Sequence, residues 1–513
     1  MPTTDFSSRR IAKNTLFLYF RMISVMLVTL YTSRVVLREL GVEDYGIYNV
    51  VAGVAMMFLF INNAMISGVQ RFLSVELGRK NAKGFNEVFS ASIAIHLGVA
   101  VTIFILCETV GLYIIDHKVV VPPEKMASVG IIYQFAVFSV FFSVMNIPFV
   151  ALIVSKEKMG LYGYIAVIEV VVKLLAACSL SLASESKLVL YGGLMFALSA
   201  LMTLSYIVVD KVHFRDVRLV RLGGLVKIRE ILLFTVWNIG AEFSIALNNY
   251  GVNILLNMFF GPVVNAARGI TYQVSNAMAY FRGNFQQAAA PQITKLYAEN
   301  NIDMQNRLVL SICRYSFFLM YFISVCVFFE AHAVLKIWLE DVPEYTVSFL
   351  RIAIINSLVC SFANPMTNMI MATGKIRLFR TIFMAETLAA FLVCYALLAL
   401  SFPPQAAFFS ELLLSCTLLF TRLAFINRMS GFKSAEFFWK VLAPIFKAVI
   451  PGVAISVLVY CSIDSDWLRF ALICLTNVVI FPASVYLWGI NDVERGFCWA
   501  CLKSALERLK TFR

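Results

Sequence analysis

The chain has 513 residues, of which 60% are hydrophobic and only 14% are charged. A soluble protein has about 45–50% apolar and about 25% charged residues. A chain this apolar cannot hide its hydrophobic surface from water by folding on itself, so a polytopic, all-α membrane protein is expected. The net charge of +13 would favour a nucleic-acid partner in a soluble protein, but here it falls in loops, and no nucleic-acid partner is expected.

Apolar segments of about 20 residues, the length that crosses a bilayer as a helix, give about fourteen candidate spans. They lie at 14–35, 46–67, 88–114, 128–154, 160–183, 188–209, 231–258, 263–287, 308–330, 346–371, 378–401, 405–427, 440–461 and 467–489.

Lysine and arginine gather in alternate loops. The basic set holds Arg9, Arg10, Lys13, Arg71, Arg79, Lys80, Lys83, Lys156, Lys158, the run 210–230, Lys295, Arg307, Lys375, Arg377, Arg380, Arg428, Lys433 and Lys440. The other set carries mainly Arg34, Arg38, Lys118, Lys125, Lys187, Lys336 and Arg469, mostly beside acids. An even number of spans places both termini on one side, and the positive-inside rule places that side in the cytoplasm.

The basic segment 210–230 is the longest cytoplasmic connection and divides the chain into two halves. We expect an N-terminal lobe over 1–209 (spans 1–6), a linker over 210–230 and a C-terminal lobe over 231–427 (spans 7–12). Spans 13–14 would occupy 428–489, and an amphipathic interfacial tail would follow at 490–513. A weak internal repeat supports the division, since LGVEDYGIYNVV (40–51) aligns with FGPVVNAARGIT (260–271).

Motifs for soluble chemistry are absent from the sequence. The eleven cysteines lie mostly in apolar runs and are interpreted as buried hydrophobic residues. There is no Gly-rich nucleotide fingerprint, no HExxH, and no histidine spacing typical of a metal site. We therefore expect no catalytic residue, no metal and no cofactor; whether a proton or a sodium ion is coupled to activity stays open.

Several basic residues fall inside predicted spans, where each costs on the order of 2.5–3.5 kcal/mol at mid-membrane. Lys173 follows Glu169 by four residues, so the two can pair along one helix face. Arg314, Arg351, Arg422 and Lys447 lie near span ends, where snorkelling is the simplest interpretation. Arg21, Arg268 and Arg282 do not fit that interpretation.

The eighth predicted span carries a polar stripe. At 100° per residue its members fall within about 120° of one another, with the two arginines ~21 Å apart. They are Asn265, Arg268, Tyr272, Ser275, Asn276, Arg282 and Gln286. In the first span Asn14 and Arg21 share a face, and Glu242 is the best acidic partner. Arginine outnumbers acid, which predicts a cationic cavity and an anionic ligand such as phosphate.

Two segments carry a family resemblance. They are IAKNTLFLYFRMISVMLVTLYTSRVVLRELGVEDYGIYNVVAGV and NAARGITYQVSNAMAYFRGNFQQAAAPQITKLYA. Both resemble the Wzx-type polysaccharide flippases of the multidrug/oligosaccharidyl-lipid/polysaccharide (MOP) exporter superfamily. The resemblance implies a V-shaped pair of six-helix lobes around a cationic cavity. It also implies that Arg21 and Arg268, with Arg282 lower on the stripe, bind pyrophosphate.

The expected function is translocation of undecaprenyl-pyrophosphate-linked oligosaccharide repeat units across the bacterial inner membrane, for surface polysaccharide or O-antigen. Expected partners are this lipid-linked oligosaccharide, membrane lipids, and a polysaccharide polymerase with its chain-length machinery. Weaker candidates for sugar contact or cavity lining are Asn14, Asn265, Tyr272, Ser275, Asn276, Gln286 and Glu242.

Two other functions stay open from the sequence. A cation-coupled multidrug exporter would need intramembrane acids, and this chain is richer in arginine there. A membrane polysaccharide polymerase or ligase would usually carry a large periplasmic loop, and no external loop here is long.

Overall fold

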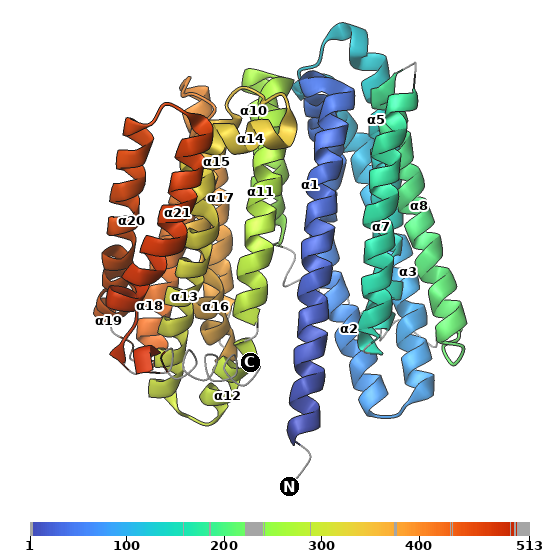
Figure 1. The fold of residues 1–513 in the computed structure, drawn as a ribbon. Helices are drawn as coiled ribbons and strands as arrows, with labels where there is room; N and C mark the ends of the chain where they lie inside the picture. The colour runs from blue at the N-terminus through green and yellow to red at the C-terminus, as the bar shows by residue number, and fades with distance from the viewer. Residues whose placement is uncertain are drawn as a thin grey trace, which may run out of the picture. The chain divides into compact units, whose positions relative to one another are not determined.

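The computed structural model describes residues 4–156, 158–183, 186–220, 240, 242–287, 289–373, 377–430, 432, 434–492, 494–496 and 499. Within these residues the chain is helical throughout its regular structure and contains no strand (Figure 1). The all-α fold expected from the composition is confirmed.

The helices are labelled as in Figure 1. The α-helices are α1 (Thr4–Met56), α2 (Asn62–Gly78), α3 (Ala82–Leu106), α4 (Leu112–Lys118), α5 (Met126–Met145), α6 (Ile147–Ser155), α7 (Met159–Ser179), α8 (Lys187–His213), α10 (Val252–Phe260), α11 (Pro262–Gln287), α12 (Ala290–Ala298), α13 (Ile302–Phe329), α14 (Ala331–Leu339), α15 (Thr346–Cys360), α16 (Ala363–Ala372), α17 (Arg377–Ala399), α18 (Ala406–Ser430), α19 (Ser434–Phe437), α20 (Ala443–Ser462) and α21 (Asp466–Ser484). The short 3₁₀ and π turns used below are η1 (Met57–Ile61), η2 (Cys107–Gly111), η3 (Pro123–Lys125), η5 (Leu247–Gly251) and η7 (Val485–Gly489).

Ten described helical stretches are long and apolar enough to cross a membrane. They run from 82–118, 123–155, 163–182, 187–213, 302–329, 346–372, 377–399, 406–429, 434–462 and 466–489. Each coincides with one predicted span. The four remaining predicted spans fall on α1, α2, α10, α11 and residues outside the described part. The ten stretches are counted among the described residues only. The chain is therefore a multi-pass membrane protein.

The first two predicted spans are not separated by a loop. α1 contains the first and the start of the second, and within it only Gly41 leaves helical geometry, with φ 76° and ψ 170°. A positive φ of this kind is readily adopted only by glycine, so one residue bends the chain between two helices. The bend lies between the two predicted spans, 14–35 and 46–67.

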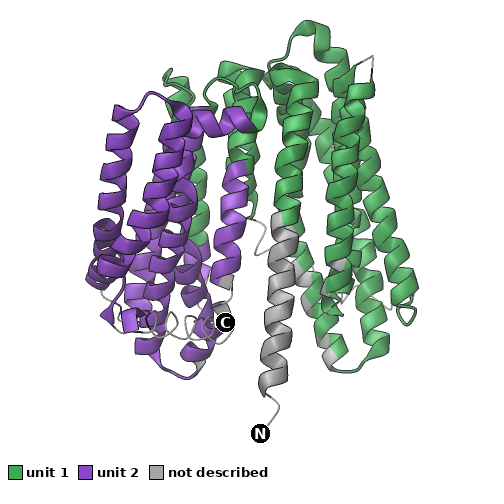
Figure 2. Cartoon of the chain, in the orientation of Figure 1, with its two compact units in different colours: residues 1–273, 338–346, 381–410 green, residues 274–337, 347–380, 411–513 purple. Residues whose placement is uncertain are grey.

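The chain forms two compact units, each described here by itself (Figure 2). Unit 1 comprises residues 1–273, 338–346 and 381–410, and unit 2 comprises residues 274–337, 347–380 and 411–513. The chain passes from one unit to the other within α11. The lobe boundaries predicted at 209 and 427 stay a prediction.

The internal repeat has a structural counterpart in unit 1. The alignment pairs Gly41 with Gly261, and Gly261 has φ 81° and ψ −176°, close to the values at Gly41. Each glycine is followed by a helix, α1 beyond Gly41 and α11 beyond Gly261. The two halves of the chain therefore share one local device, a glycine bend before a membrane helix.

These two helices meet at very close range. A Cβ at Gly46 would collide with the backbone carbonyl of Pro262, and a Cβ at Gly269 would lie 3.1 Å from the Asn49 side chain. The repeat alignment makes residue 49 the counterpart of residue 269. Equivalent positions of the two repeats thus face each other, which is the arrangement of a pseudo-two-fold axis.

Amide and hydroxyl groups hold this crossing together. Asn253 Nδ2 donates to the Asn49 carbonyl (3.2 Å), and Gln273 Nε2 donates to the Tyr45 hydroxyl (2.7 Å). Asn265 Nδ2 donates to the backbone carbonyl and side-chain oxygen of Asn253 (2.7 and 2.8 Å). We call these five residues the polar seam.

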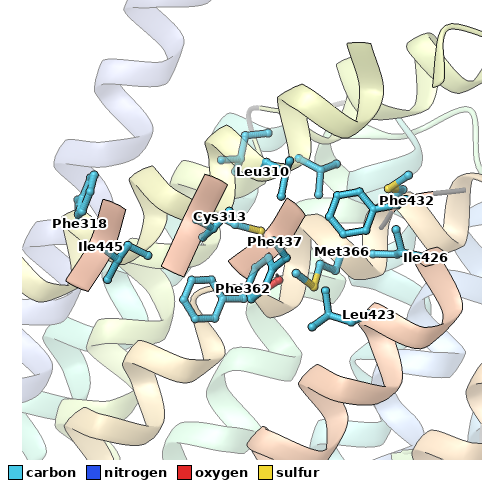
Figure 3. Packing of buried hydrophobic residues seen from close by; sticks show 14 of the residues in the cluster. Leu310, Cys313, Phe318, Phe362, Met366, Leu423, Ile426, Phe432, Phe437 and Ile445 are labelled. Atoms are coloured by element: carbon cyan, nitrogen blue, oxygen red, sulfur yellow. Dashed lines mark hydrogen bonds between the residues drawn. The ribbon is translucent and has the colours of Figure 1, made fainter. Parts of the chain in front are cut away.

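Unit 2 contains a large apolar core (Figure 3). Phe362 stacks on Phe317 with ring centroids 5.7 Å apart and meets the edge of Phe437 at 5.4 Å. Around them pack Leu310, Cys313, Met366, Leu423, Ile426, Phe432 and Ile445. Lipid tails are as apolar as these side chains, so close van der Waals contact and not water exclusion stabilises this core.

Gly46 gives a direct test of the crossing. Gly46→Ala should lower the free energy of unfolding by about 1–3 kcal/mol, because the added methyl meets helix backbone that cannot turn aside. Thermal unfolding of the purified protein in detergent measures the change. Gly98→Ala in α3 is the matched control, because no atom lies within 4 Å of its added Cβ. Equal melting temperatures for the two variants would contradict the crossing.

Candidate functional site

α11 carries the site predicted from the sequence. Pro262 opens the helix directly after the Gly261 bend, a position where the missing proline N–H costs nothing. The helix then runs unbroken to Gln287, so the seven stripe residues do lie on one helix. Its polar content keeps it out of the ten apolar spans. The stripe side chains nevertheless have very different surroundings.

Arg268 is held by backbone oxygens in unit 1. It is 4% exposed, and its guanidinium donates to the carbonyls of Asn249 (2.7 Å) and Asn248 (3.3 Å). Both carbonyls belong to the π turn η5 (Leu247–Gly251), where regular helical hydrogen bonding is interrupted. A side-chain donor commonly satisfies backbone groups freed in this way within a membrane.

The side chain of Tyr272 completes the setting of Arg268. Its hydroxyl accepts a hydrogen bond from Arg268 Nη2 (2.9 Å), and its ring lies 4.3 Å from the guanidinium carbon. This combines a hydrogen bond with a cation–π contact. Arg268 therefore stabilises the π turn of its own unit through several groups at once.

Asn265 and Gln286, two predicted sugar contacts, are buried and hydrogen-bonded inside their units. Asn265 is 0% exposed and belongs to the polar seam. Gln286 is 1% exposed and donates to Ser316 Oγ (2.9 Å) and to the Ser361 carbonyl (2.6 Å) in unit 2. Both act as structural side chains in this conformation.

Arg282 has the freest guanidinium of the stripe. It is half-buried in unit 2, and its one hydrogen bond to a described residue is a long one from Nη1 to the Ser357 carbonyl (3.3 Å). Its Nε is enclosed without an acceptor. Among the residues that the structure describes, no carboxylate forms an ion pair with it. On the same helix Ser275, seven residues earlier, is half-buried and Asn276, six residues earlier, is exposed.

Three other residues predicted from the sequence are Asn14, Arg21 and Glu242. The side chains of Asn14 and Arg21 lie outside the described part of the structure, although both residues belong to α1. Glu242 is half-buried and already engaged with neighbouring groups.

Arg314 and Arg351 do not snorkel as the sequence predicted. Arg314 Nη2 lies 2.6 Å from both carboxylate oxygens of Glu494, just beyond η7. Arg351 donates to the carbonyls of Phe328 and Phe329 at the end of α13 (3.1 and 3.2 Å). Both satisfy protein groups, because a guanidinium can reach an orphan helix carbonyl as readily as a headgroup.

The predicted Lys173–Glu169 ion pair is not formed among the described residues.

A buried carboxyl group, Asp210, and a half-buried one, Glu108, were not among the site residues predicted from the sequence. Asp210 is 5% exposed, and neither carboxylate oxygen accepts a hydrogen bond from a described residue. α8 extends through it to His213, whereas the sequence placed it in the solvated linker. Glu108, in η2, accepts a hydrogen bond from Gln134 (3.2 Å), and its other oxygen is enclosed without a described partner.

Lys156, the basic residue that follows α6, pairs with another acid. Its Nζ lies 2.7 Å from Asp216 and over the ring of Phe85. This hydrogen bond holds the pKa of Asp216 below its usual value. Asp216 therefore has a basic partner that Asp210 lacks among the described residues.

The fold is shared with solved transporters. An inward-facing multidrug resistance MATE family transporter of the MOP superfamily matches with a TM-score of 0.65 at 13% identity, over 80% of this chain and 99% of its own. The lipid II flippase MurJ, in an inward closed conformation, matches with a TM-score of 0.65 at 12% identity, over 91% of this chain and 98% of its own. A MOP superfamily transporter from Pyrococcus furiosus, described as having a binding pocket of reversed polarity, matches with a TM-score of 0.58 at 14% identity, over 80% and 95%.

No family model and no curated protein sequence matches the chain. The fold class is therefore that of the MOP superfamily transporters, a multi-pass membrane fold. At these identities the likeness concerns the fold, and the substrate has to be argued from the side chains.

The two stripe arginines should differ in their effect on stability. Arg268→Ala should lower the free energy of unfolding by about 2–3 kcal/mol, because it removes charged hydrogen bonds and leaves the buried Asn248 carbonyl without this donor. Arg282→Ala should change it by less than about 1 kcal/mol. Thermal unfolding in detergent measures both. Equal losses would show that Arg282 is as tightly held as Arg268.

The Asp210 carboxylate should lower the free energy of unfolding of the protein. Asp210→Asn keeps the shape and removes a buried charge, so the free energy of unfolding should rise by about 1–3 kcal/mol at neutral pH. Asp216→Asn is the matched control, because it removes the ion pair with Lys156 and should leave stability unchanged or slightly lower. A loss of stability in Asp210→Asn would mean that the carboxylate has a stabilising partner.

Proposed function

We propose that the chain is a flippase that moves undecaprenyl-pyrophosphate-linked oligosaccharide repeat units from the cytoplasmic to the periplasmic leaflet of a bacterial inner membrane. The fold supports transport, since its neighbours include both multidrug transporters and a lipid II flippase. The flippase covers a larger share of this chain than the MATE transporter does. This is expected if residues 428–489 have a counterpart in the lipid II branch.

The single observation that carries the proposal is Arg282. Its guanidinium lies half-buried on a membrane helix, with spare donors and without a carboxylate among the described residues. Such a group repels organic cations and attracts anions, and its planar fork matches phosphate oxygens. The enclosed Nε gains a partner when a phosphate binds, so the cost of burying it is offset by the ligand.

The proposed roles divide along α11. Arg282 binds the pyrophosphate, and Arg21 is a pyrophosphate ligand by the family resemblance alone. Ser275 and Asn276 lie about two turns away on the same helix and have exposed surface, so they contact the sugars nearest the phosphate. Arg268 contributes positive charge while it holds the π turn in place.

A cation-coupled multidrug exporter is the alternative function. Glu108 is the observation that favours it, because a half-buried carboxylate with one unsatisfied oxygen is the group such a transporter uses to hold a cation. Its partner Gln134 leaves that oxygen free to bind. The two functions make opposite demands on charge, so substitution of Glu108 and Arg282 separates them.

Loss of the Arg282 guanidinium should block export. Arg282→Ala should reduce flipping by about ten- to a hundredfold, the loss expected for charged hydrogen bonds to a phosphate. Mass spectrometry of cell lipids should then show a lipid-linked oligosaccharide accumulating, and surface polysaccharide should fall. Arg282→Lys should keep part of the activity, since the charge remains without the fork.

Lys295→Ala on α12 is the matched control, because it removes one exposed positive charge that pairs only with Glu299 among the described residues. It should leave export unchanged. Normal export by a well-folded Arg282→Ala protein would contradict the proposal. Loss of resistance to cationic dyes in Glu108→Gln, with export of glycan intact, would favour the multidrug alternative.

A further inference from the structure

The segment 338–346 belongs to unit 1, although the residues on either side of it belong to unit 2 (Figure 2). It joins α14 (Ala331–Leu339) to α15 (Thr346–Cys360). In sequence it therefore lies within the C-terminal half of the chain. Its contacts are with α1, at the end that the charge bias places in the periplasm.

Two polar contacts fasten the segment to α1. The indole Nε1 of Trp338 donates to the Leu30 carbonyl (2.8 Å), and Arg34 Nη2 lies 2.6 Å from Glu340 Oε1. Leu30 and Arg34 are four residues apart, so both contacts fall on one face of the helix. The indole sits at a helix end, as tryptophan commonly does at a membrane surface.

The ion pair is of a reversible kind. The Arg34 side chain is 34% exposed and the Glu340 side chain 47% exposed, so water competes for both charges. The hydrogen bond from Arg34 holds the pKa of Glu340 below its usual value. The carboxylate is thus charged at neutral pH, and the pairing is lost only as the pH falls through that lowered pKa.

The backbone of the segment is strained. Glu340 has φ 63° and Tyr345 has φ 68°, left-handed values that residues other than glycine adopt only at an energetic cost. Such conformations persist where surrounding contacts enforce them. Release of the contacts with α1 lets the strain relax, so the segment is poised between a fastened and a free state.

A second fastening joins the two halves of the chain in the same way. The Val120 N–H donates to Asn257 Oδ1 (2.6 Å), and Asn257 Nδ2 donates back to the Val120 carbonyl (3.3 Å). Val120 lies between α4 and η3, in a loop that the charge bias also places outside. The outer ends of the two halves are therefore joined by polar groups that water can replace, unlike the apolar packing of unit 2.

We propose that the 338–346 segment is a latch on the periplasmic end of α1. Fastened through Trp338 and Glu340, it keeps this end closed while substrate loads from the cytoplasm, and it releases for discharge outside. The proposal rests on the proposed transport function, because a latch has a role only where the outer end opens.

Thr346 provides a reporter of the latch. It is 0% exposed, and its hydroxyl has no hydrogen bond to a described residue, so Thr346→Cys removes no known contact. The reporter is introduced into a chain whose native cysteines have been replaced. The rate of its labelling by a membrane-impermeant maleimide is then measured in right-side-out inner-membrane vesicles.

Arg34→Glu should raise the labelling rate by about two- to fivefold, as expected for loss of a partly exposed ion pair. The charge-swapped pair Arg34→Glu with Glu340→Arg should return the rate to that of the reporter alone. Arg38→Glu is the matched control, because Arg38 donates its hydrogen bonds to its own neighbour Glu39. Its charge acts on Glu340 without a hydrogen bond, so this change should raise the rate less than Arg34→Glu does.

A labelling rate that Arg34→Glu leaves unchanged, or that Arg38→Glu raises equally, would overturn the latch. Flipping of lipid-linked oligosaccharide is measured separately in proteoliposomes made with the same proteins. If the labelling rates follow the expected pattern while no variant flips this lipid, the proposed substrate fails and the latch stands.

Discussion

The structure of unit 1 depends on the near-contact of two helix backbones, α1 at Gly46 and α11 at Pro262. Helices that approach this closely need residues without side chains at the crossing, and Gly46 and Gly269 supply them. The approach angle is set beforehand by Gly41 and Gly261, each of which bends the chain with a positive φ. Four glycines thus bring the two repeats together, and the polar seam forms because the repeats meet.

The contacts that stand out differ between the two units. In unit 2 aromatic and aliphatic side chains interlock in one core, although Gln286 and Arg314 also form polar contacts within this unit. In unit 1 the two halves of the chain meet through amides, hydroxyls, an indole and an ion pair. Water can take the place of each of these hydrogen-bond partners at little net cost.

Composition and periodicity predicted the class of fold and ten of the spans, because hydrophobic length is a local property of the sequence. The sequence also predicted the internal repeat, whose alignment pairs Gly41 with Gly261. It favoured Arg268 over Arg282 as the anion ligand, the reverse of the ranking proposed above. Helical geometry places both on one stripe, whereas the π turn that captures Arg268 lies about 20 residues earlier and depends on tertiary packing. Asp210 was missed for the same reason, since a basic run of sequence gave no sign that α8 would bury it.

The setting of Arg268 has a thermodynamic consequence. Its guanidinium has a fixed set of five N–H donors, and the carbonyls of Asn248 and Asn249 already use some of them. An anion that recruits Arg268 therefore competes with the helix for the same protons. Binding of the anion and formation of the π turn are therefore coupled. An anion that takes these donors destabilises the π turn, and the π turn lowers the binding affinity of the anion by the same free energy. Ligand and helix shape at this position form a single equilibrium.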